Sequence, residues 1–131
     1  MAVEIARPVG GMTVYGLLSA TFDQSIKAQG LQVNVPIEPT KGESWFLSLA
    51  PSYDKVLTGF AAEYMLGLFN GIEDLREGVP SFGVLSFDRM AHSDIGSSID
   101  IFRQLTRAVV RALTMEQVPE TPEEAFALLA I

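Results

Sequence analysis

The sequence predicts an α+β domain, a two-layer sandwich in which two helices cover one face of a four-stranded sheet. Three observations predict this fold class. Three early segments are rich in β-forming residues, two later segments repeat apolar residues at steps of three and four, and one further β-rich run separates those two. The expected order is β-β-β-α-β-α. At 131 residues without an internal repeat, the chain is expected to form one domain, residues 1–131.

Three strands are expected in the first half of the chain. Residues 14–22 are rich in β-forming residues and follow a Gly-Gly pair. Residues 31–37 alternate apolar and polar side chains with period two, and Pro36 among them indicates a sheet edge. Residues 44–49 are the third candidate strand, closed by Pro51.

The second half predicts helices on either side of a fourth strand. Residues 60–77 place their apolar side chains on one helical stripe, and residues 82–88 are the fourth strand. A second stripe over 97–114 predicts a helix that starts at a serine cap. A short terminal helix is expected over 121–130, where Thr121-Pro122-Glu123-Glu124 has the pattern of a capping box. The sheet-side core residues expected to meet the helices are Leu17, Val33, Val35, Phe46 and Val84.

Composition excludes several kinds of site. The chain has no cysteine and a single histidine, His92, so disulfides, thiolate catalysis and multi-histidine metal sites cannot form. We therefore expect no metal and no cofactor. The net charge of −7 argues against a general polyanion binder. Four acids near the end supply much of it, and residues 1–115 carry twelve acids and nine bases.

No targeting or spanning segment is expected. The N-terminus lacks the basic patch and apolar run of a secretory signal, and the longest uncharged stretch, residues 8–22, is interrupted by glycines. These features favour a soluble, cytoplasmic protein without a membrane role. Phosphate-binding loop motifs are also missing, and Gly10-Gly11 precedes a strand rather than a helix, so no nucleotide is expected to bind.

One polar cluster has the residue types of catalysis. Residues 88–98 are expected to form the loop between the fourth strand and the second helix, and they hold a histidine, carboxylates and hydroxyls. A Ser–His–Asp arrangement is conceivable there. The structural alternative is that Ser97 or Ser98 caps the helix, Asp94 closes a turn and His92 is solvated. We favour the structural alternative.

Two surface features point to binding. Arg103, Arg107 and Arg111 lie four residues apart and form a basic stripe, which either meets phosphates or an acidic partner or is simply a solvated face. The helix over 60–77 carries more apolar residues than one stripe can bury. Either the terminal helix covers the excess, or this helix docks on another subunit.

Four short motifs follow one another between the two ends of the chain. They are Gly10-Gly11-Met12-Thr13-Val14-Tyr15-Gly16, then Glu63-Tyr64 with Gly71-Ile72, then Gly83-Val84-Leu85-Ser86-Phe87-Asp88, and last His92 with Ser97-Ser98 and Phe102. Their content and order resemble domain IV of translation elongation factor G and related translational GTPases, over about residues 10–115. The resemblance implies a left-handed crossover in the β-α-β unit and no enzymatic activity of the domain itself.

The chain departs from that family in its loops. Leu17 stands where the family usually has histidine, Thr58-Gly59-Phe60-Ala61 lacks the proline of the tip loop, and Gly96 replaces an aspartate. In the family these loops form the end of the domain that enters the ribosomal decoding region. The departures imply a related domain whose ribosomal role is lost or altered.

The sequence thus predicts a non-enzymatic, translation-factor-like domain that binds a ribosome, RNA or a protein partner. The residues expected to carry binding are His92, Ser93, Asp94, Thr58, Gly59, Arg103, Arg107 and Arg111. The alternative is a self-associating module, a homodimer through residues 60–77, without a ribosomal role. An enzyme that uses residues 88–98 is the third reading.

Overall fold

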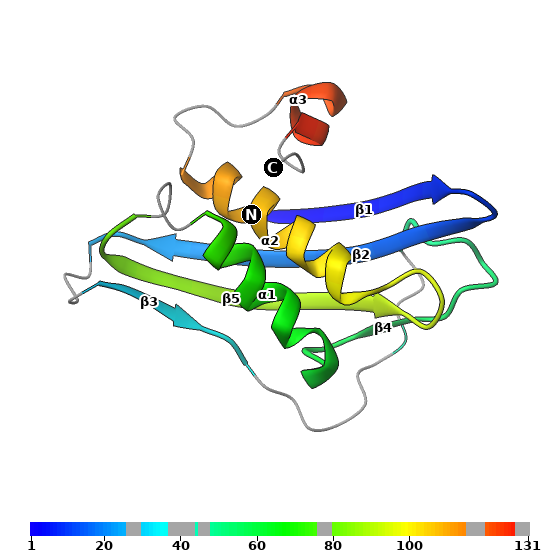
Figure 1. Ribbon diagram of the computed structural model, residues 1–131, viewed down its shortest axis with the longest axis horizontal. Helices are drawn as coiled ribbons and strands as arrows, with labels where there is room; N and C mark the ends of the chain where they lie inside the picture. Colours follow the sequence, from blue (N-terminus) through cyan, green and yellow to red (C-terminus); the bar gives the residue numbers. More distant parts are fainter. Residues whose placement is uncertain (26–29, 37–43, 45–47, 76–79, 115–119, 128–131) are drawn as a thin grey trace.

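A five-stranded sheet and three α-helices make up the computed structural model, which describes residues 1–25, 30–36, 44, 48–75, 80–114 and 120–127 (Figure 1). The strands are β1 (Ala2–Val9), β2 (Met12–Asp23), β3 (Leu31–Asn34), β4 (Val56–Thr58) and β5 (Gly83–Ser93). The helices are the single 3-10 turn η1 (Ala62–Tyr64), α1 (Met65–Asp74), α2 (Ile99–Thr114) and α3 (Pro122–Ala127). The mixed α+β class is the one expected from the sequence.

The strands lie in the order β1-β2-β5-β3, and β4 pairs with the far end of β5. Pairing is antiparallel except between β3 and β5, which run parallel. Because Ala91 pairs with both β2 and β4, β3 and β4 share one edge of β5. The sheet therefore has five strands rather than the expected four.

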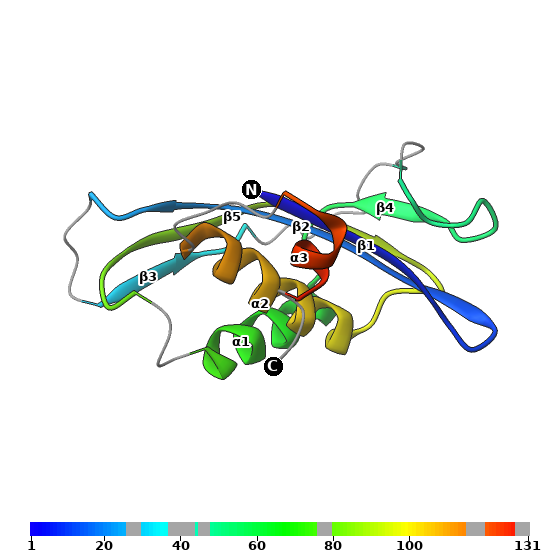
Figure 2. The ribbon, with the colours of Figure 1, turned by 90° about the horizontal axis from the view of Figure 1, so that it is seen from above.

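The crossover from β3 through α1 to β5 is left-handed. In Figure 1 both strands point to the right, β5 lies above β3, and α1 lies in front of the sheet, as the view from above in Figure 2 also shows. Parallel β-α-β connections are nearly always right-handed. The rare handedness is the one that the resemblance to domain IV implies.

The N-terminal strand β1 was not expected from the sequence. It forms a hairpin with β2 through Gly10-Gly11, where Gly10 has a φ of 63°, as the first central residue of a type II′ turn requires. Met1 and Ala20 exchange two backbone hydrogen bonds, so by alternation the backbone nitrogen of Pro8 faces away from β2. Proline is tolerated there because an outward nitrogen on an edge strand needs no partner.

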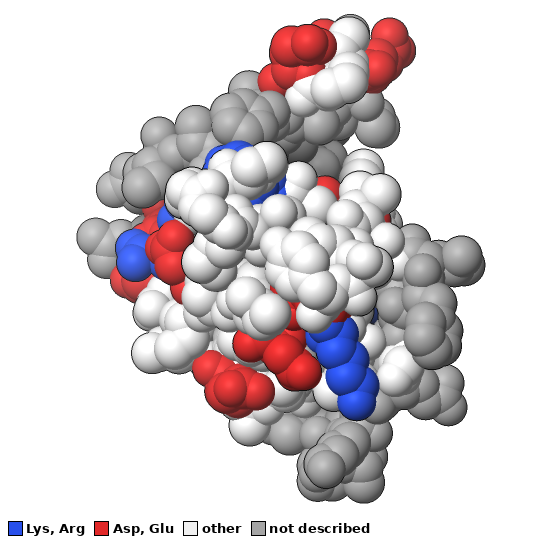
Figure 3. All heavy atoms as spheres, turned by 90° about the vertical axis from the view of Figure 1, so that its right-hand side faces the viewer, with Lys and Arg blue, Asp and Glu red and all other residues white. Residues whose placement is uncertain are grey.

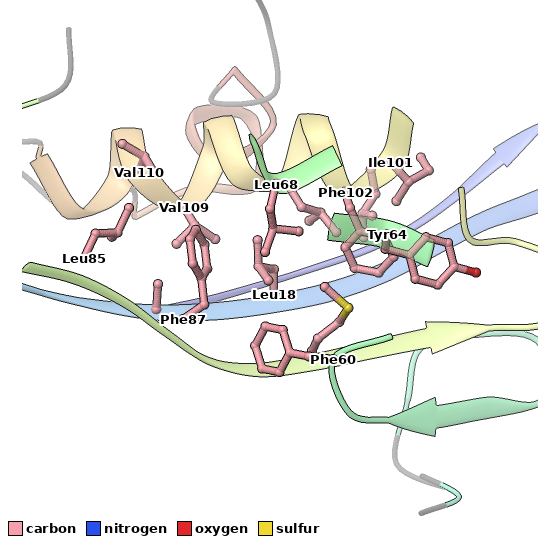
Figure 4. Close-up of a cluster of buried hydrophobic side chains, with 14 residues drawn as sticks. Leu18, Phe60, Tyr64, Leu68, Leu85, Phe87, Ile101, Phe102, Val109 and Val110 are labelled. Atoms are coloured by element: carbon pink, nitrogen blue, oxygen red, sulfur yellow. The ribbon is translucent and has the colours of Figure 1, made fainter. Parts of the chain in front are cut away.

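The helices α1 and α2 lie on one side of the sheet (Figure 2), and α3 lies beyond the edge formed by β1 (Figure 1). Figure 4 shows the main core, in which α2 and α1 lie over β2 and β5. Its buried members are Ile5, Leu18, Ala20, Phe60, Tyr64, Leu68, Leu85, Phe87, Met90, Ile101, Phe102, Leu105, Val109 and Val110. Fourteen buried apolar side chains between two layers give this small domain a continuous core.

Glycines set the distances between the layers. A Cβ on Gly16 of β2 would lie 2.7 Å from the Leu105 side chain, so α2 packs directly on the strand backbone. A Cβ on Gly67 would lie 2.5 Å from the Ile99 carbonyl, and one on Gly71 would lie 2.6 Å from Thr106. The two glycines of α1 therefore allow the backbones of α1 and α2 to lie in direct contact.

The other face of the sheet holds a second, smaller apolar cluster. Tyr15, Leu17, Val56 and Ala91 are buried there, with Ala50 packed against them. The prediction that Leu17 faces the helices is therefore wrong, because it alternates with the helix-facing Leu18. Val33 and Val35 do pack on the main core, Val84 is buried outside it, and Phe46 lies outside the described residues.

Several element boundaries also differ from expectation. In the candidate strand 44–49, Ser44 makes an isolated bridge to Leu57, and residues 45–47 lie outside the described part of the chain. The expected helix over 60–77 is helical from Ala62 to Asp74. The strand expected over 82–88 continues to Ser93 across an irregularity opposite Ser19 and Ala20. The polar residues Asp88 and Arg89 lie at this irregularity. Because they interrupt the run of β-forming residues, the sequence predicts that the strand ends at residue 88.

The terminal helix follows its predicted cap. Glu124 N donates to Thr121 Oγ1 at 3.1 Å, and Glu120 N donates to the Glu124 carboxylate at 2.9 Å. The helix α3 starts at Pro122, as expected, and its predicted end at 130 lies outside the described residues. It lies on the far side of α2 from α1 (Figure 1).

Candidate functional site

Five of the eight predicted binding residues gather where β4, β5 and the loop before α2 meet. Thr58 pairs with Ala91, and Gly59 N donates to the Met90 carbonyl at 2.8 Å. His92 pairs with Leu57, and Asp94 N donates to the Lys55 carbonyl at 3.1 Å. His92 and Ser93 are thus strand residues, and the prediction of a long loop over 88–98 is wrong.

A buried carboxylate organises the loop before α2. Asp54 is 5% exposed, and its two oxygens accept hydrogen bonds from Ile95 N and Gly96 N, both at 2.9 Å. Gly96 N also donates to Ser93 Oγ at 3.0 Å. Asp54 therefore binds two successive backbone donors of this loop, and one of them, Gly96 N, is buried. The sequence analysis missed Asp54, because nothing in its flanking Tyr53 and Lys55 signals burial.

Ser97 ties the same loop to the sheet. Its hydroxyl donates to the Tyr15 carbonyl at 2.7 Å and accepts from Ser93 N at 2.8 Å. Tyr15 N in turn donates to the Gly96 carbonyl at 2.9 Å. Ser98 Oγ accepts from Ile101 N at 3.2 Å, so Ser98 caps α2 as one of the two predicted serines.

His92 packs against an aromatic ring and is only partly exposed to solvent. Its ring centroid lies 5.3 Å from that of Tyr64, and Tyr64 stacks at 4.8 Å on Phe102 in the core. The side chain is half-buried, and burial lowers the pKa of the His92 imidazole. The negative charges of Glu63 and Asp94 act in the opposite direction but have a smaller effect. The expectation of an exposed imidazole is wrong, since alternation along β5 turns His92 toward the helix layer.

This arrangement does not assemble a nucleophile and base. The hydroxyl of Ser97 is bonded to backbone atoms and that of Ser93 accepts from Gly96 N, whereas the His92 ring makes no hydrogen bond to a described residue. An open cavity of about 510 Å³ lies nearby, lined by Ser44, Ser48, Ser52, Tyr53 and Lys55 among others, and His92 is not in its lining. Among the described residues, no group of three metal-ligating side chains comes together.

The predicted basic stripe is part of a contact between helices. Arg103 donates to both oxygens of Asp74, each at 2.6 Å, and Arg107 Nη1 donates to Asp74 Oδ2 at 2.7 Å. Arg107 is buried, and Arg111 is half-buried. The expectation of a solvated stripe is therefore wrong for Arg107, whereas the Arg103 side chain is 40% exposed and pairs with Asp74 at the surface. Arginine spacing alone could not reveal Asp74, which belongs to another helix.

Asp74 is ionised over a wide pH range. Its hydrogen bond from Arg103 is the main reason that the pKa of this carboxyl falls to about 2, and the bond from Arg107 adds to the effect. Burial acts in the opposite direction. One carboxylate thus binds two arginines.

The end of the molecule beyond this loop is mainly uncharged. Figure 3 faces it and shows a broad white surface with small red and blue groups, of which one red and one blue group adjoin below the centre, and no continuous basic patch among the coloured residues. Val9 and Met12 of the hairpin and Ile95 and Ile99 near α2 are all more than two-fifths exposed. This surface suits apolar contacts better than phosphates.

Comparison of the chain with protein-family models, curated proteins and solved structures found no match. None of the helices in the described part of the chain is long and apolar enough to cross a membrane.

Proposed function

We propose that this chain is a non-enzymatic, translation-factor-like binding domain of the domain IV type, acting in the cytoplasm. The observation that carries the proposal is the left-handed β3-α1-β5 crossover, which lies within an observed order of β-β-β-β-α-β-α-α. A left-handed crossover is rare, whereas many unrelated proteins have an α+β fold. The handedness therefore supports the resemblance more strongly than the fold class does.

The motif residues also have matching structural roles. Gly16 and Gly71 stand where a helix packs on a strand or on another helix, and Tyr64 joins α1 to β5 and α2. Ser97 and Ser98 fix the start of α2. The motifs therefore specify the packing of one fold, which is what residues shared with a structural family are expected to do.

Within this function, the structure favours a protein surface over RNA as the partner. Arg103 and Arg107 are engaged with Asp74, and the exposed end of the domain is apolar. Affinity for nucleic acid depends on cations that neutralise phosphates. The partner-binding roles of His92, Ser93, Asp94, Thr58 and Gly59 stay part of the proposal, with Ser93 supporting the loop from within.

Co-sedimentation with ribosomes over a range of salt concentrations tests the proposal. We expect the purified chain to sediment with ribosomes, and log affinity to fall with log salt with a slope shallower than about −1, since few phosphates are contacted. A slope of roughly −2 to −3 would indicate three phosphate contacts and refute the protein-surface part. No sedimentation at low salt would refute the translational setting itself, and an unrelated acidic protein of similar size is the control.

Self-association is a second candidate, favoured by one observation. Leu66 and Phe69 on α1 are 55% and 57% exposed, and α3, which was one expected cover for them, lies beyond α2. The net charge of −7 opposes the approach of two copies at low salt. Sedimentation velocity at low and high salt decides this, since a dimer through α1 would strengthen with salt.

A further inference from the structure

Four exposed apolar side chains lie around the N-terminal halves of α1 and α2. Leu66 and Phe69 are three residues apart on the solvent face of α1, and Ile95 and Ile99 flank the start of α2 with exposed fractions of 50% and 41%. The close contact between Gly67 and the Ile99 carbonyl brings the two helices together here. We call Leu66, Phe69, Ile95 and Ile99 the apolar patch.

Three exposed carboxylates border the apolar patch. Glu63 precedes Leu66 by one turn, Asp94 precedes Ile95, and Asp100 follows Ile99. The charges of Glu63 and Asp94 both act on His92 and on Tyr64, so both carboxylates lie near the same aromatic pair. Arg103, one turn beyond Ile99, is held by Asp74. We call Glu63, Asp94 and Asp100 the acidic rim.

An apolar surface with an acidic border selects its partner by charge as well as by shape. RNA and anionic lipid would meet like charge at the acidic rim. A second copy would bring an identical acidic rim against the first. A basic, amphipathic helix satisfies both features, because its apolar side chains cover the patch while its lysines or arginines reach the carboxylates.

We propose that the apolar patch and the acidic rim form a docking surface for an amphipathic helix of a partner protein that carries basic residues beside its apolar stripe. This inference rests on the proposed binding function and names the chemistry of its partner. It does not depend on the partner being ribosomal.

Fluorescence anisotropy with synthetic peptides tests the docking surface on the full chain. The probe is a labelled helical peptide of leucine and lysine, with leucines on one stripe. Its controls are the same peptide with glutamate in place of lysine and a peptide of equal positive charge with serine in place of leucine. We expect the leucine–lysine peptide to bind at least about tenfold more tightly than either control. The ratio of its affinity to that of the glutamate peptide should fall as the salt concentration rises, because salt screens the charges of the acidic rim.

Matched variants locate the binding. Phe69→Ser and Leu66→Ser should each weaken binding of the leucine–lysine peptide about fivefold or more, and Glu63→Gln should weaken it less and reduce its salt dependence. Leu49→Ser is the control, since Leu49 is 65% exposed and its backbone nitrogen contacts Glu4 of β1, away from α1. Circular dichroism of each variant verifies that it is folded.

Three results would overturn the inference. They are equal binding of the lysine and glutamate peptides, unchanged binding in both serine variants, and a dimer that Phe69→Ser converts to a monomer. Failure of ribosome co-sedimentation with retained peptide binding would refute the translational setting alone. Retained co-sedimentation without peptide binding would refute this inference alone.

Discussion

Arg107 of α2 and Asp74 at the end of α1 form an ion pair, with 2.7 Å between Nη1 and Oδ2. The Arg107 side chain is 5% exposed and that of Asp74 is 17% exposed, so the pair closes the α1–α2 contact at its solvent edge. Arg103 binds the same carboxylate from the outside. Arg103 and Arg107, which the sequence suggests are part of a binding stripe, therefore hold two helices together.

Asp74→Asn should lower the free energy of unfolding by about 2 kcal/mol or more, because it removes the carboxylate charge that pairs with the buried Arg107 guanidinium. Urea denaturation measures the change. Asp100→Asn is the control, an exposed acid bonded to Gln104 on α2, and should cost less than about 0.5 kcal/mol. Equal losses in the two variants would show that the pair contributes nothing specific.

Acid should weaken the protein through the same residue. The folded pKa of Asp74 is about 2, against an ordinary 3.8. A lowered folded pKa gives a stabilisation that is complete above the unfolded value and is lost as the pH falls through the folded one. We expect a loss of stability between about pH 4 and 2 that is smaller in Asp74→Asn, as measured by urea midpoints over that range. Identical acid profiles would contradict this.

The helices were predicted well because their stripes are local and regular. The second helix was expected over 97–114 and spans Ile99–Thr114, since Ile101, Phe102, Leu105 and Val109 repeat on one face. The edge strand β1 was missed because Glu4, Arg7 and Pro8 interrupt any alternation, and an edge strand needs only one buried side.

The candidate site was predicted in part. Sequence reasoning found the polar segment around His92 and the capping serines, because histidine and Ser-Ser before an apolar stripe are visible locally. It missed Asp54, which supports the loop from 41 residues away, because long-range hydrogen bonds leave no trace in local spacing. It also placed His92 in solvent, since the polar pair Asp88-Arg89 hid the continuation of β5.

His92 should give the stability a second pH dependence. Burial holds its folded pKa below the ordinary 6.5, so the folded state binds the proton less readily than the unfolded state. Its contribution is complete above pH 6.5 and declines as the pH falls from there through the folded pKa. His92→Gln should remove this decline, and denaturant midpoints around pH 5 to 7 measure it. If the pH dependence of stability were the same in His92→Gln as in the unchanged protein, the decline would have to come from another group.

Asp54→Ala should cost about 2 kcal/mol or more, because Ile95 N and Gly96 N would lose the carboxylate that they share. Asp94→Ala is the matched control, an exposed acid in the same loop, with an expected loss below about 0.5 kcal/mol. Thermal unfolding followed by circular dichroism compares the two. A larger loss of stability in Asp94→Ala than in Asp54→Ala would show that Asp94, and not Asp54, stabilises this loop.

Gly96→Ala should destabilise the fold by about 2 kcal/mol or more, although a methyl group is the smallest possible addition. A Cβ at Gly96 would collide with the Thr13 carbonyl and lie 3.0 Å from Tyr15 N, which are backbone atoms that cannot turn aside. Gly11→Ala is the control, because a Cβ there meets nothing within 4 Å. Hydrogen exchange should locate the damage, with faster exchange at Tyr15 N, which donates to the Gly96 carbonyl. Equal stability of the two alanine variants would show that the loop before α2 moves away from β2 without cost.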